Sequence, residues 1–369
     1  MPPEVLDLFT ELAAVPSPPG EERAVADLVL GYLRDCGLAA DEDGAGPEIG
    51  STMGNIYARL EPTAEGEPLF LCAHLDTVPP TAAIEPVVED GVVRNAAGTI
   101  LGADNKAAVA AMLEGARRVL VEGRPHAGIE LLFTPKEEVG LVGAYAFDHK
   151  RLHARLGYVY DQAAPVGHVI LGAPYSQSLE VTFHGRAAHS GMHPEDGRSA
   201  IAAAARAISE LRLGRVDEDS TANVGTITGG TATNIVPEWC TFVAEARSHD
   251  ERKLADLIQE MQDAITFAAG VAECDVETKA RKSYRGYRFG KSDRAVALAA
   301  DALQRCGHEV VYELSGGAAD ANVFNERGLE CVNLANGMTD IHTPAEHIAV
   351  SDLEAMVDVT LALVDAALA

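Results

Sequence analysis

Short apolar runs of strand length alternate with helix-length segments in the first half of the chain and again near its end. Leu69–Cys72 and Ile129–Phe133 are typical of strands that are buried on both faces. From about Lys106, apolar residues recur every three or four positions, and Gly123 and Pro125 end this predicted helix. The alternation predicts an α/β domain with a mostly parallel sheet flanked by helices. Further strands are expected at residues 156–160 and 331–334, and further helices at residues 139–147 and 353–363.

The middle of the chain has a different rhythm, β-α-β-β-α-β, which is the ferredoxin-like pattern. We therefore expect an inserted α+β domain at residues 176–285, between the two halves, 1–175 and 286–369, of one α/β domain. The elements expected in the insertion are residues 178–183, 200–211, 223–228, 240–246, 253–268 and 272–278.

Charge and cysteine usage narrow the class of protein. The chain has 56 acidic and 29 basic residues, a formal net charge of −27, which disfavours binding to nucleic acids and to anionic membranes. It has no apolar run long enough to cross a membrane, and its start lacks the pattern of a secretory signal. The six cysteines form no CxxC pair, which favours reduced thiols over disulfides. We therefore expect a cytoplasmic protein.

Metal-competent side chains follow the predicted strands at the points where these strands end. Taken singly, such a residue is more often a helix cap or a hydrogen-bonded loop residue. Because the carboxyl ends of parallel strands meet at one edge of a sheet, we expect the whole set to converge there. Nitrogen and oxygen ligands without sulfur suit zinc, cobalt or manganese. The residues concerned are His74, Asp76, Asp104, Glu137, Glu138, Asp161 and His342.

Motifs along nearly the whole chain carry a family resemblance. In order they are HLDTVP, LGADNKAAVA, FTPKEEVG, YVYDQ, GRAAHSG, GGTATNIVPE, EARSHD and IHTPAEH. This set resembles the dinuclear-zinc exopeptidases and deacylases, which include carboxypeptidase G, acetylornithine deacetylase and succinyl-diaminopimelate desuccinylase, and is most similar to their peptidase T-like branch. The resemblance implies the zinc exopeptidase-like phosphorylase/hydrolase fold, with the insertion serving as a lid and dimerisation domain.

The resemblance also implies a role for each of the residues at the sheet edge. Two divalent metal ions, zinc or alternatively cobalt or manganese, would share Asp104 as a bridging ligand, and the peptide between Asp104 and Asn105 would be cis. Asp76 would orient the imidazole of His74, and Glu137 would be the general base. The implied metal ligands are His74, Asp104, Glu138, Asp161 and His342.

Five further residues are implied to act on the substrate. His189 of the insertion would reach into the partner subunit's site and stabilise the oxyanion. Asn234 and Arg247 would hold a carboxylate or a carbonyl of the substrate, and Gly316 and Gly317 would let the backbone approach it. On residue type alone, each of the five is also compatible with an ordinary structural role: a loop histidine, an Asn turn, an ion pair or a glycine turn.

The function expected from this resemblance is that of a metal-dependent exopeptidase. It would be a homodimer that hydrolyses short peptides in the manner of a tripeptide aminopeptidase, with a metal-activated water. Two alternatives stay open on the same machinery, an N-acyl-amino-acid deacylase and a carboxypeptidase. A non-catalytic metal-binding protein is a third interpretation, against which stands the presence of Glu137 and of every implied ligand.

Overall fold

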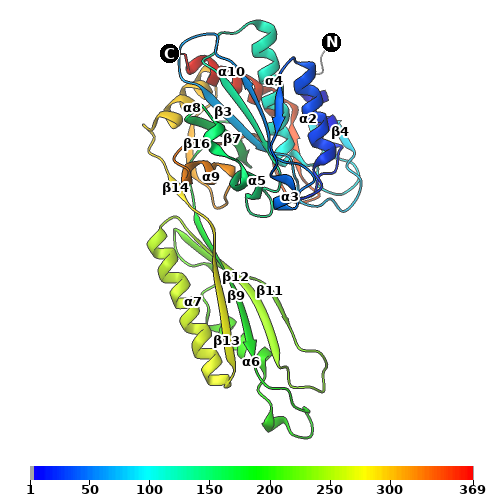
Figure 1. The fold of residues 1–369 in the computed structure, drawn as a ribbon, viewed down its shortest axis with the longest axis vertical. Coiled ribbons are helices and arrows are strands. Elements are labelled where there is room, and N and C mark those ends of the chain that lie inside the picture. The colour runs from blue at the N-terminus through cyan, green and yellow to red at the C-terminus, as the bar shows by residue number, and fades with distance from the viewer. Residues whose placement is uncertain (1–3, 369) are drawn as a thin grey trace. The chain divides into compact units, whose positions relative to one another are not determined.

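The computed structural model describes residues 4–368, and it divides into two compact units. One unit contains the chain up to Ala173 and from Arg288 onward, and the other contains Pro174–Tyr287 (Figure 1). Among residues 4–368, no helix combines the length and the apolar character that a membrane span requires.

A mixed sheet is the centre of the first unit. Within the described residues it has nine strands, in the order β1-β2-β6-β3-β7-β16-β8-β14, with β15 paired to β8. The parallel sheet expected from the sequence is its middle part, and antiparallel pairs adjoin it on both sides. The parallel middle strands are β6 (Ile129–Thr134), β3 (Leu69–His74), β7 (Leu156–Gln162) and β16 (Glu330–Ala335). The outer strands are β1 (Ala40–Glu42), β2 (Ile56–Leu60), β8 (His168–Ala173), β14 (Tyr287–Arg288) and β15 (Val311–Leu314).

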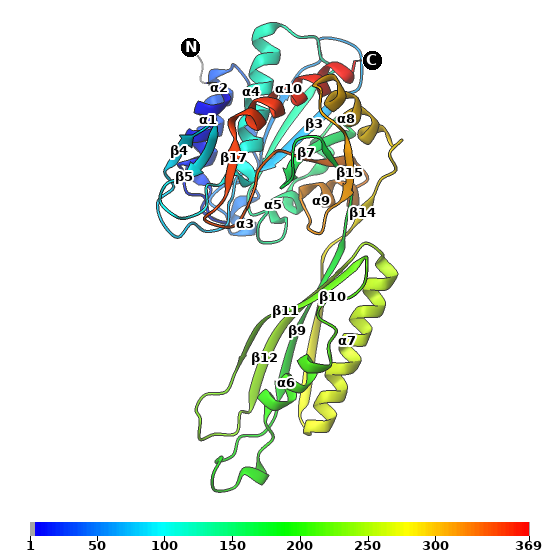
Figure 2. The same cartoon turned by 180° about the vertical axis from the view of Figure 1, so that it is seen from behind.

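Helices cover both faces of this sheet, which explains why β3 and β6 are buried along their whole length. The helices of the first unit are α1 (Val5–Ala13), α2 (Arg23–Asp35), α3 (Gly46–Ile49), α4 (Ala103–Glu122), α5 (Val142–Ala146), α8 (Arg294–Arg305), α9 (Asp320–Glu326) and α10 (Val350–Ala366). A small separate sheet has the order β17-β5-β4 and consists of β4 (Pro86–Glu89), β5 (Val92–Asn95) and β17 (His347–Ala349). Helices α4 and α10 lie side by side over the main sheet (Figures 1 and 2).

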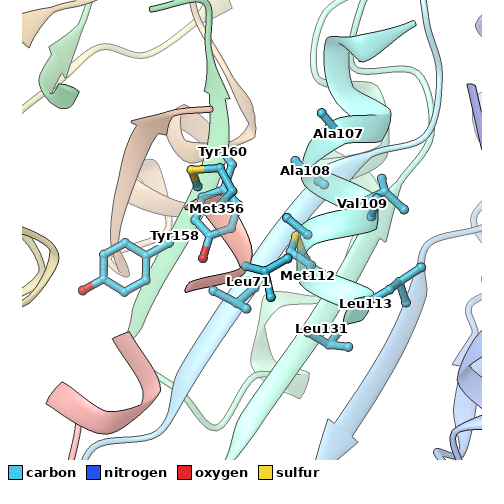
Figure 3. Packing of buried hydrophobic residues seen from close by; sticks show 14 of the residues in the cluster. Leu71, Ala107, Ala108, Val109, Met112, Leu113, Leu131, Tyr158, Tyr160 and Met356 are labelled. Carbon is cyan, nitrogen blue, oxygen red and sulfur yellow. The ribbon is translucent and has the colours of Figure 1, made fainter. Parts of the chain in front are cut away.

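Alternate side chains of β3 serve the two faces, as the pleat of a strand requires. Leu71 packs into the cluster formed with Met112 of α4 and Met356 of α10 (Figure 3). The neighbouring residue, Phe70, points to the other face, where its ring meets the ring of Phe324 of α9 edge-on, with the centroids 5.0 Å apart. The most buried helix, α4, is therefore held against the strands that carry the candidate site.

The second unit has the expected β-α-β-β-α-β order, with the two-residue strand β10 added before β11. Its antiparallel sheet has the order β10-β11-β12-β9-β13, and its core includes Val181, Phe183 and Phe242. One boundary expected from the sequence is wrong, because Ala272 belongs to α7 and the last strand begins only at Asp275, after Glu273 ends the helix in a left-handed conformation. The elements are β9 (Tyr175–His184), α6 (Ala200–Glu210), β10 (Gly214–Arg215), β11 (Ser220–Gly229), β12 (Trp239–Ser248), α7 (Glu251–Ala272) and β13 (Asp275–Tyr284).

Candidate metal centre

The parallel strands deliver imidazoles and carboxylates to one edge of the main sheet. His74 is the last residue of β3, Asp161 lies near the end of β7, and Glu138 follows the end of β6. Asp104 enters from the start of α4, where its backbone is not yet helical and its peptide bond to Asn105 is cis, as expected. His342 lies in the loop between β16 and β17, with a positive φ of 63°.

Asp104 lies between the two imidazoles, with one carboxylate oxygen toward each. Its Oδ1 is 3.2 Å from Nε2 of His74, and its Oδ2 is 3.1 Å from Nε2 of His342. Asp161 is beside the first imidazole, at 3.8 Å from His74 Nε2, and Glu138 is beside the second, at 3.0 Å from His342 Nε2. The five side chains therefore form two groups that share one carboxylate.

The orientation of His74 fits a cation at the first group. Its Nδ1 is 2.9 Å from the carbonyl oxygen of Asp76, so this nitrogen donates, and Nε2 presents a lone pair whenever it carries no proton. That lone pair points at carboxylate oxygens of Asp104 and Asp161, which are acceptors too. Only a proton or a metal cation satisfies such a cluster of acceptors, and the nitrogen–oxygen donor set suits zinc-like ions. His74, Asp104 and Glu138 also offer ligand atoms that all lie within 4.8 Å of one another.

Burial and crowding shift the proton affinities of these groups strongly. Burial would lower the pKa of His74, but its hydrogen bonds to carboxylates, first to Asp104, raise it well above the usual value. Hydrogen bonds to Asp104 and Glu138 raise the pKa of His342 to about 10. Burial and the negative charge of Asp104 raise the pKa of Asp161 to about 8. Negative charge is thus concentrated here beyond what the two imidazoles compensate.

Glu137 is adjacent to the ligand Glu138 and has a different environment. Burial is the main cause that raises the pKa of Glu137 well above its usual value, and nearby carboxylates such as Asp161 add to the effect. A carboxyl group with a raised proton affinity is suited to accept and return a proton near neutral pH.

Asp76 has a second task that the sequence did not indicate. Its carboxylate accepts hydrogen bonds from the backbone N–H groups of Glu137 (2.9 Å) and Glu138 (3.1 Å). The contact to His74 Nδ1 is closer through its carbonyl oxygen, at 2.9 Å, than through its carboxylate, at 3.6 Å. Asp76 therefore both orients the imidazole and holds the turn that presents the two glutamates.

Two buried polar residues behind the centre were missed by the sequence analysis. Asn333 of β16 holds the backbone of Asp161 from both sides, by accepting from its N–H at 2.9 Å and donating to its carbonyl at 3.0 Å. Asp320 accepts a hydrogen bond from the Thr134 hydroxyl at 2.5 Å, directly before the turn that carries Glu137. An asparagine inside the apolar run Val332-Asn333-Leu334 was the available signal.

The expected substrate-binding glycines lie in the same unit, between β15 and α9. Neither Gly316 nor Gly317 has a positive φ, and an added Cβ on either would meet at most the Ser315 hydroxyl, 3.8 Å from Gly317. Within the described residues, no packing contact requires a glycine at either position.

The structure places the other three expected residues, His189, Asn234 and Arg247, in the second unit, apart in sequence and unit from the five ligands. The loops of His189 and Asn234 are joined by a hydrogen bond from Ser190 N–H to the Asn234 carbonyl, at 3.0 Å. The N–H groups of Gly191 and Met192 both donate to Nδ1 of His189 at 3.2 Å, so Nδ1 is an acceptor and the exposed ring carries its proton on Nε2. Arg247 of β12 is half-buried and pairs with Glu245 at 3.0 Å.

Comparison with known proteins finds two family models along the chain. Residues 55–179 match peptidase family M28, and residues 172–273 match the peptidase dimerisation domain. The uncharacterised protein YqjE of Bacillus subtilis is 36% identical over 367 residues, which are 98% of either chain. A probable carboxypeptidase of Arthroderma gypseum is 30% identical over 263 residues, which are 64% of this chain and 56% of the relative.

Among the solved structures that match almost the whole chain are an aminopeptidase and a tripeptidase. Aminopeptidase PepT from Bacillus cereus has a TM-score of 0.89 and 35% identity, with 98% of each chain covered. A tripeptidase from Staphylococcus aureus has a TM-score of 0.93 and 34% identity, with 98% of this chain and 96% of that chain covered. With this similarity over its full length and with its convergent imidazoles and carboxylates, the chain belongs to the peptidase T-like family of metallopeptidases.

Proposed function

We propose that this protein is a dinuclear metallo-exopeptidase that removes the amino-terminal residue from short peptides, with tripeptides as its main substrates. The observation that carries the proposal is the position of Asp104, whose two oxygens face two different imidazoles at 3.2 and 3.1 Å. A shared carboxylate is what two neighbouring cations need to offset their repulsion. The similarity to an aminopeptidase and a tripeptidase supports the substrate class.

His74, Asp104 and Asp161 would hold one divalent ion, and Asp104, Glu138 and His342 would hold the other. Bound there, zinc, cobalt or manganese would polarise the scissile carbonyl and lower the pKa of a shared water to near 7. Glu137 would accept the proton of that water and return it to the leaving amine. Asp76 would hold Glu137 and Glu138 in position during this transfer, by accepting hydrogen bonds from their backbone N–H groups.

Residues of the second unit would complete the substrate site. His189 is suited to stabilise an oxyanion, because its Nδ1 is occupied as an acceptor and its Nε2–H is left to donate. The planar guanidinium of Arg247 and the amide of Asn234 would bind a carboxylate or a carbonyl of the peptide. Gly316 and Gly317 would line the approach of the substrate backbone, a role supported by the absence of any contact closer than 3.8 Å to a Cβ added on either residue.

The proposal includes a homodimer in the cytoplasm. The match of residues 172–273 to the peptidase dimerisation domain supports association through the second unit. All six cysteines are free thiols, which suits a reducing compartment.

The second candidate is hydrolysis from the other end, by a carboxypeptidase or an N-acyl-amino-acid deacylase with the same metal centre. The similarity to a probable carboxypeptidase supports it, over about two thirds of this chain. The two candidates differ in which end of the substrate is held, and this is a property of the substrate-binding residues and not of the metal ligands.

A substrate panel tests both candidates. The metal-loaded protein is incubated with tripeptides of three different residues, with dipeptides and with acetylamino acids, and mass spectrometry identifies the products. We expect a free amino-terminal residue and a dipeptide, with loss of activity on chelation and recovery when Zn²⁺ is returned. Release of the carboxyl-terminal residue or of acetate would select the second candidate, and no product from any substrate would refute both.

A further inference from the structure

Glu346 is a buried carboxylate that the proposed mechanism does not use. Glu346 is only 2% exposed. Both oxygens of its carboxylate accept hydrogen bonds from the backbone of one short segment. Oε2 accepts from the N–H groups of Leu101 (2.8 Å) and Gly102 (2.9 Å), and Oε1 accepts from the N–H of Asp104 (3.0 Å). One carboxylate thus binds the three backbone donors that lead into the shared ligand.

These donors belong to a stretch of backbone that cannot satisfy them by regular helix bonding. Gly102 is in the left-handed region, and Asp104 and Asn105 have non-helical dihedral angles although α4 continues directly after them. The first N–H groups of a helix have no partner within the helix, so they need an acceptor from elsewhere in the fold. Glu346 supplies that acceptor from a position 242 residues further along the chain than Asp104.

Glu346 also belongs to the loop that presents the other imidazole. It lies four residues after His342, in the segment between β16 and β17. The same side chain therefore fastens the segment of His342 to the segment of Asp104, whose Oδ2 is 3.1 Å from His342 Nε2. The buried amino group of Lys106 donates to the carbonyl of Val15, and it is close enough to Glu346 for that carboxylate to oppose the effect of burial, which lowers the pKa of Lys106 to about 7.

We propose that Glu346 is a positioning residue that sets the Asp104 carboxylate against His342 and thereby determines how tightly the metal pair is bound. This inference rests on the proposed function, because it assigns Asp104 and His342 to the metal centre. An amide cannot replace Glu346, since its NH₂ group would face at least one backbone N–H and leave that donor unpaired.

The test is metal titration of apo-protein variants by calorimetry, together with their unfolding temperatures. The Glu346→Gln variant should bind Zn²⁺ about 10- to 100-fold more weakly than the wild type, the usual effect of losing a residue that supports a ligand. Glu130→Gln is the matched control, because Glu130 is 1% exposed and also accepts from backbone N–H groups, those of His153 and Ala154, at the opposite end of β6. It should lower the unfolding temperature and leave Zn²⁺ affinity within about twofold of wild type.

An unchanged Zn²⁺ affinity in Glu346→Gln, or an equal loss in Glu130→Gln, overturns the role of Glu346 while the proposed function stands. Should Glu346→Gln not fold, Glu346→Asp takes its place under the same criterion, since the shorter carboxylate keeps the charge and cannot reach all three donors. A wild-type protein that binds none of Zn²⁺, Co²⁺ and Mn²⁺ overturns the proposed function and this inference together.

Discussion

At the residue scale, the ligand atoms of the centre are oriented by hydrogen bonds made elsewhere on the same residues. The carbonyl of Asp76 accepts from His74 Nδ1 and so turns Nε2 toward the carboxylates. Asn333 holds the backbone of Asp161 and leaves its carboxylate unoccupied by that contact. Such supporting bonds restrict ligand rotation before any ion binds, so less ordering is required at binding.

The assignment of Glu137 as a proton carrier separates catalysis from metal binding. Glu137→Gln keeps the size of the side chain and removes its ability to accept a proton, so turnover of a tripeptide should fall by at least about 100-fold. Metal content, measured by atomic emission after gel filtration, should equal that of the wild type. Glu61→Gln, at an acid whose side chain is 75% exposed, is the control and should leave both quantities unchanged. Retained turnover in Glu137→Gln would remove it as the base.

Asp320 predicts a pH dependence of stability in the metal-free protein. Burial raises its pKa from 3.8 to about 6, and its Oδ1 is buried without a hydrogen-bond partner among residues 4–368. The folded state therefore binds this proton more tightly than the unfolded state, and the contribution of Asp320 to stability decreases as pH rises from about 4 to above 6.

The Asp320→Asn variant cannot titrate, and its amide oxygen can still accept from Thr134. Its free energy of unfolding, relative to wild type, should increase by about 1 kcal/mol between pH 5 and pH 7. Urea denaturation of both apo proteins over this range measures the difference. A constant difference between the two proteins would show that Asp320 is already charged at pH 5 in the folded state.

At the scale of elements, α4 contributes a candidate metal ligand at its first turn and packs into the hydrophobic core along most of its length. Its start delivers Asp104, while Gly115 in its middle allows close packing against α10. A Cβ on Gly115 would lie 2.7 Å from Cγ2 of Thr360, whose hydroxyl is 3.0 Å from that of Tyr160. The position of α4 on the sheet, and with it that of Asp104, therefore depends on this contact.

Gly115→Ala should lower the free energy of unfolding by about 1–3 kcal/mol, because the added methyl group overpacks the contact with Thr360. Gly31→Ala in α2 is the matched control, since no described atom lies within 4 Å of its added Cβ. There the loss of backbone freedom in the unfolded chain should raise stability by about 0.5–1 kcal/mol. Chemical denaturation of the two variants should thus give changes of opposite sign, and equal signs would contradict the packing argument.

At the scale of the whole molecule, the proposed machinery is divided between the two units. The five candidate ligands and Glu137 belong to the first unit, while His189, Asn234 and Arg247 belong to the second. The resemblance implies that His189 acts in the site of the partner subunit, so the homodimer would be needed for activity. Light scattering should then give twice the 38.9 kDa mass of one chain.

Subunit mixing tests this exchange directly. His189→Ala and Glu137→Gln dimers should each be inactive, for different reasons. After dissociation and reassembly of an equal mixture, half of the dimers are mixed, and one of their two sites has both Glu137 and a partner's His189. A quarter of all sites are then complete, so about a quarter of wild-type activity should return if each His189 acts in the site of its partner. If His189 served its own chain, no site would be complete and the mixture would stay inactive.

The local pattern of the sequence was sufficient to predict the central parallel strands and the types of side chain that gather at their ends. Burial on both faces makes most residues of a parallel strand apolar, so β3, β6, β7 and β16 could be predicted from short apolar runs. Strand ends then indicated where polar side chains would gather, because parallel neighbours end at the same edge. The edge strands of the sheet escaped prediction, since strands such as β1 and β15 are short and only partly buried.

Only the tertiary structure decided which atoms meet. The direction of each Asp104 oxygen, the hydrogen bonds of Asp76 to the turn of Glu137 and Glu138, and the reach of Glu346 to a segment more than 240 residues away have no local signature. The physical reason is that a buried polar group is paired by whatever the packed chain brings near it. Sequence periodicity determines which face of an element is buried, but not which distant donor or acceptor will lie opposite.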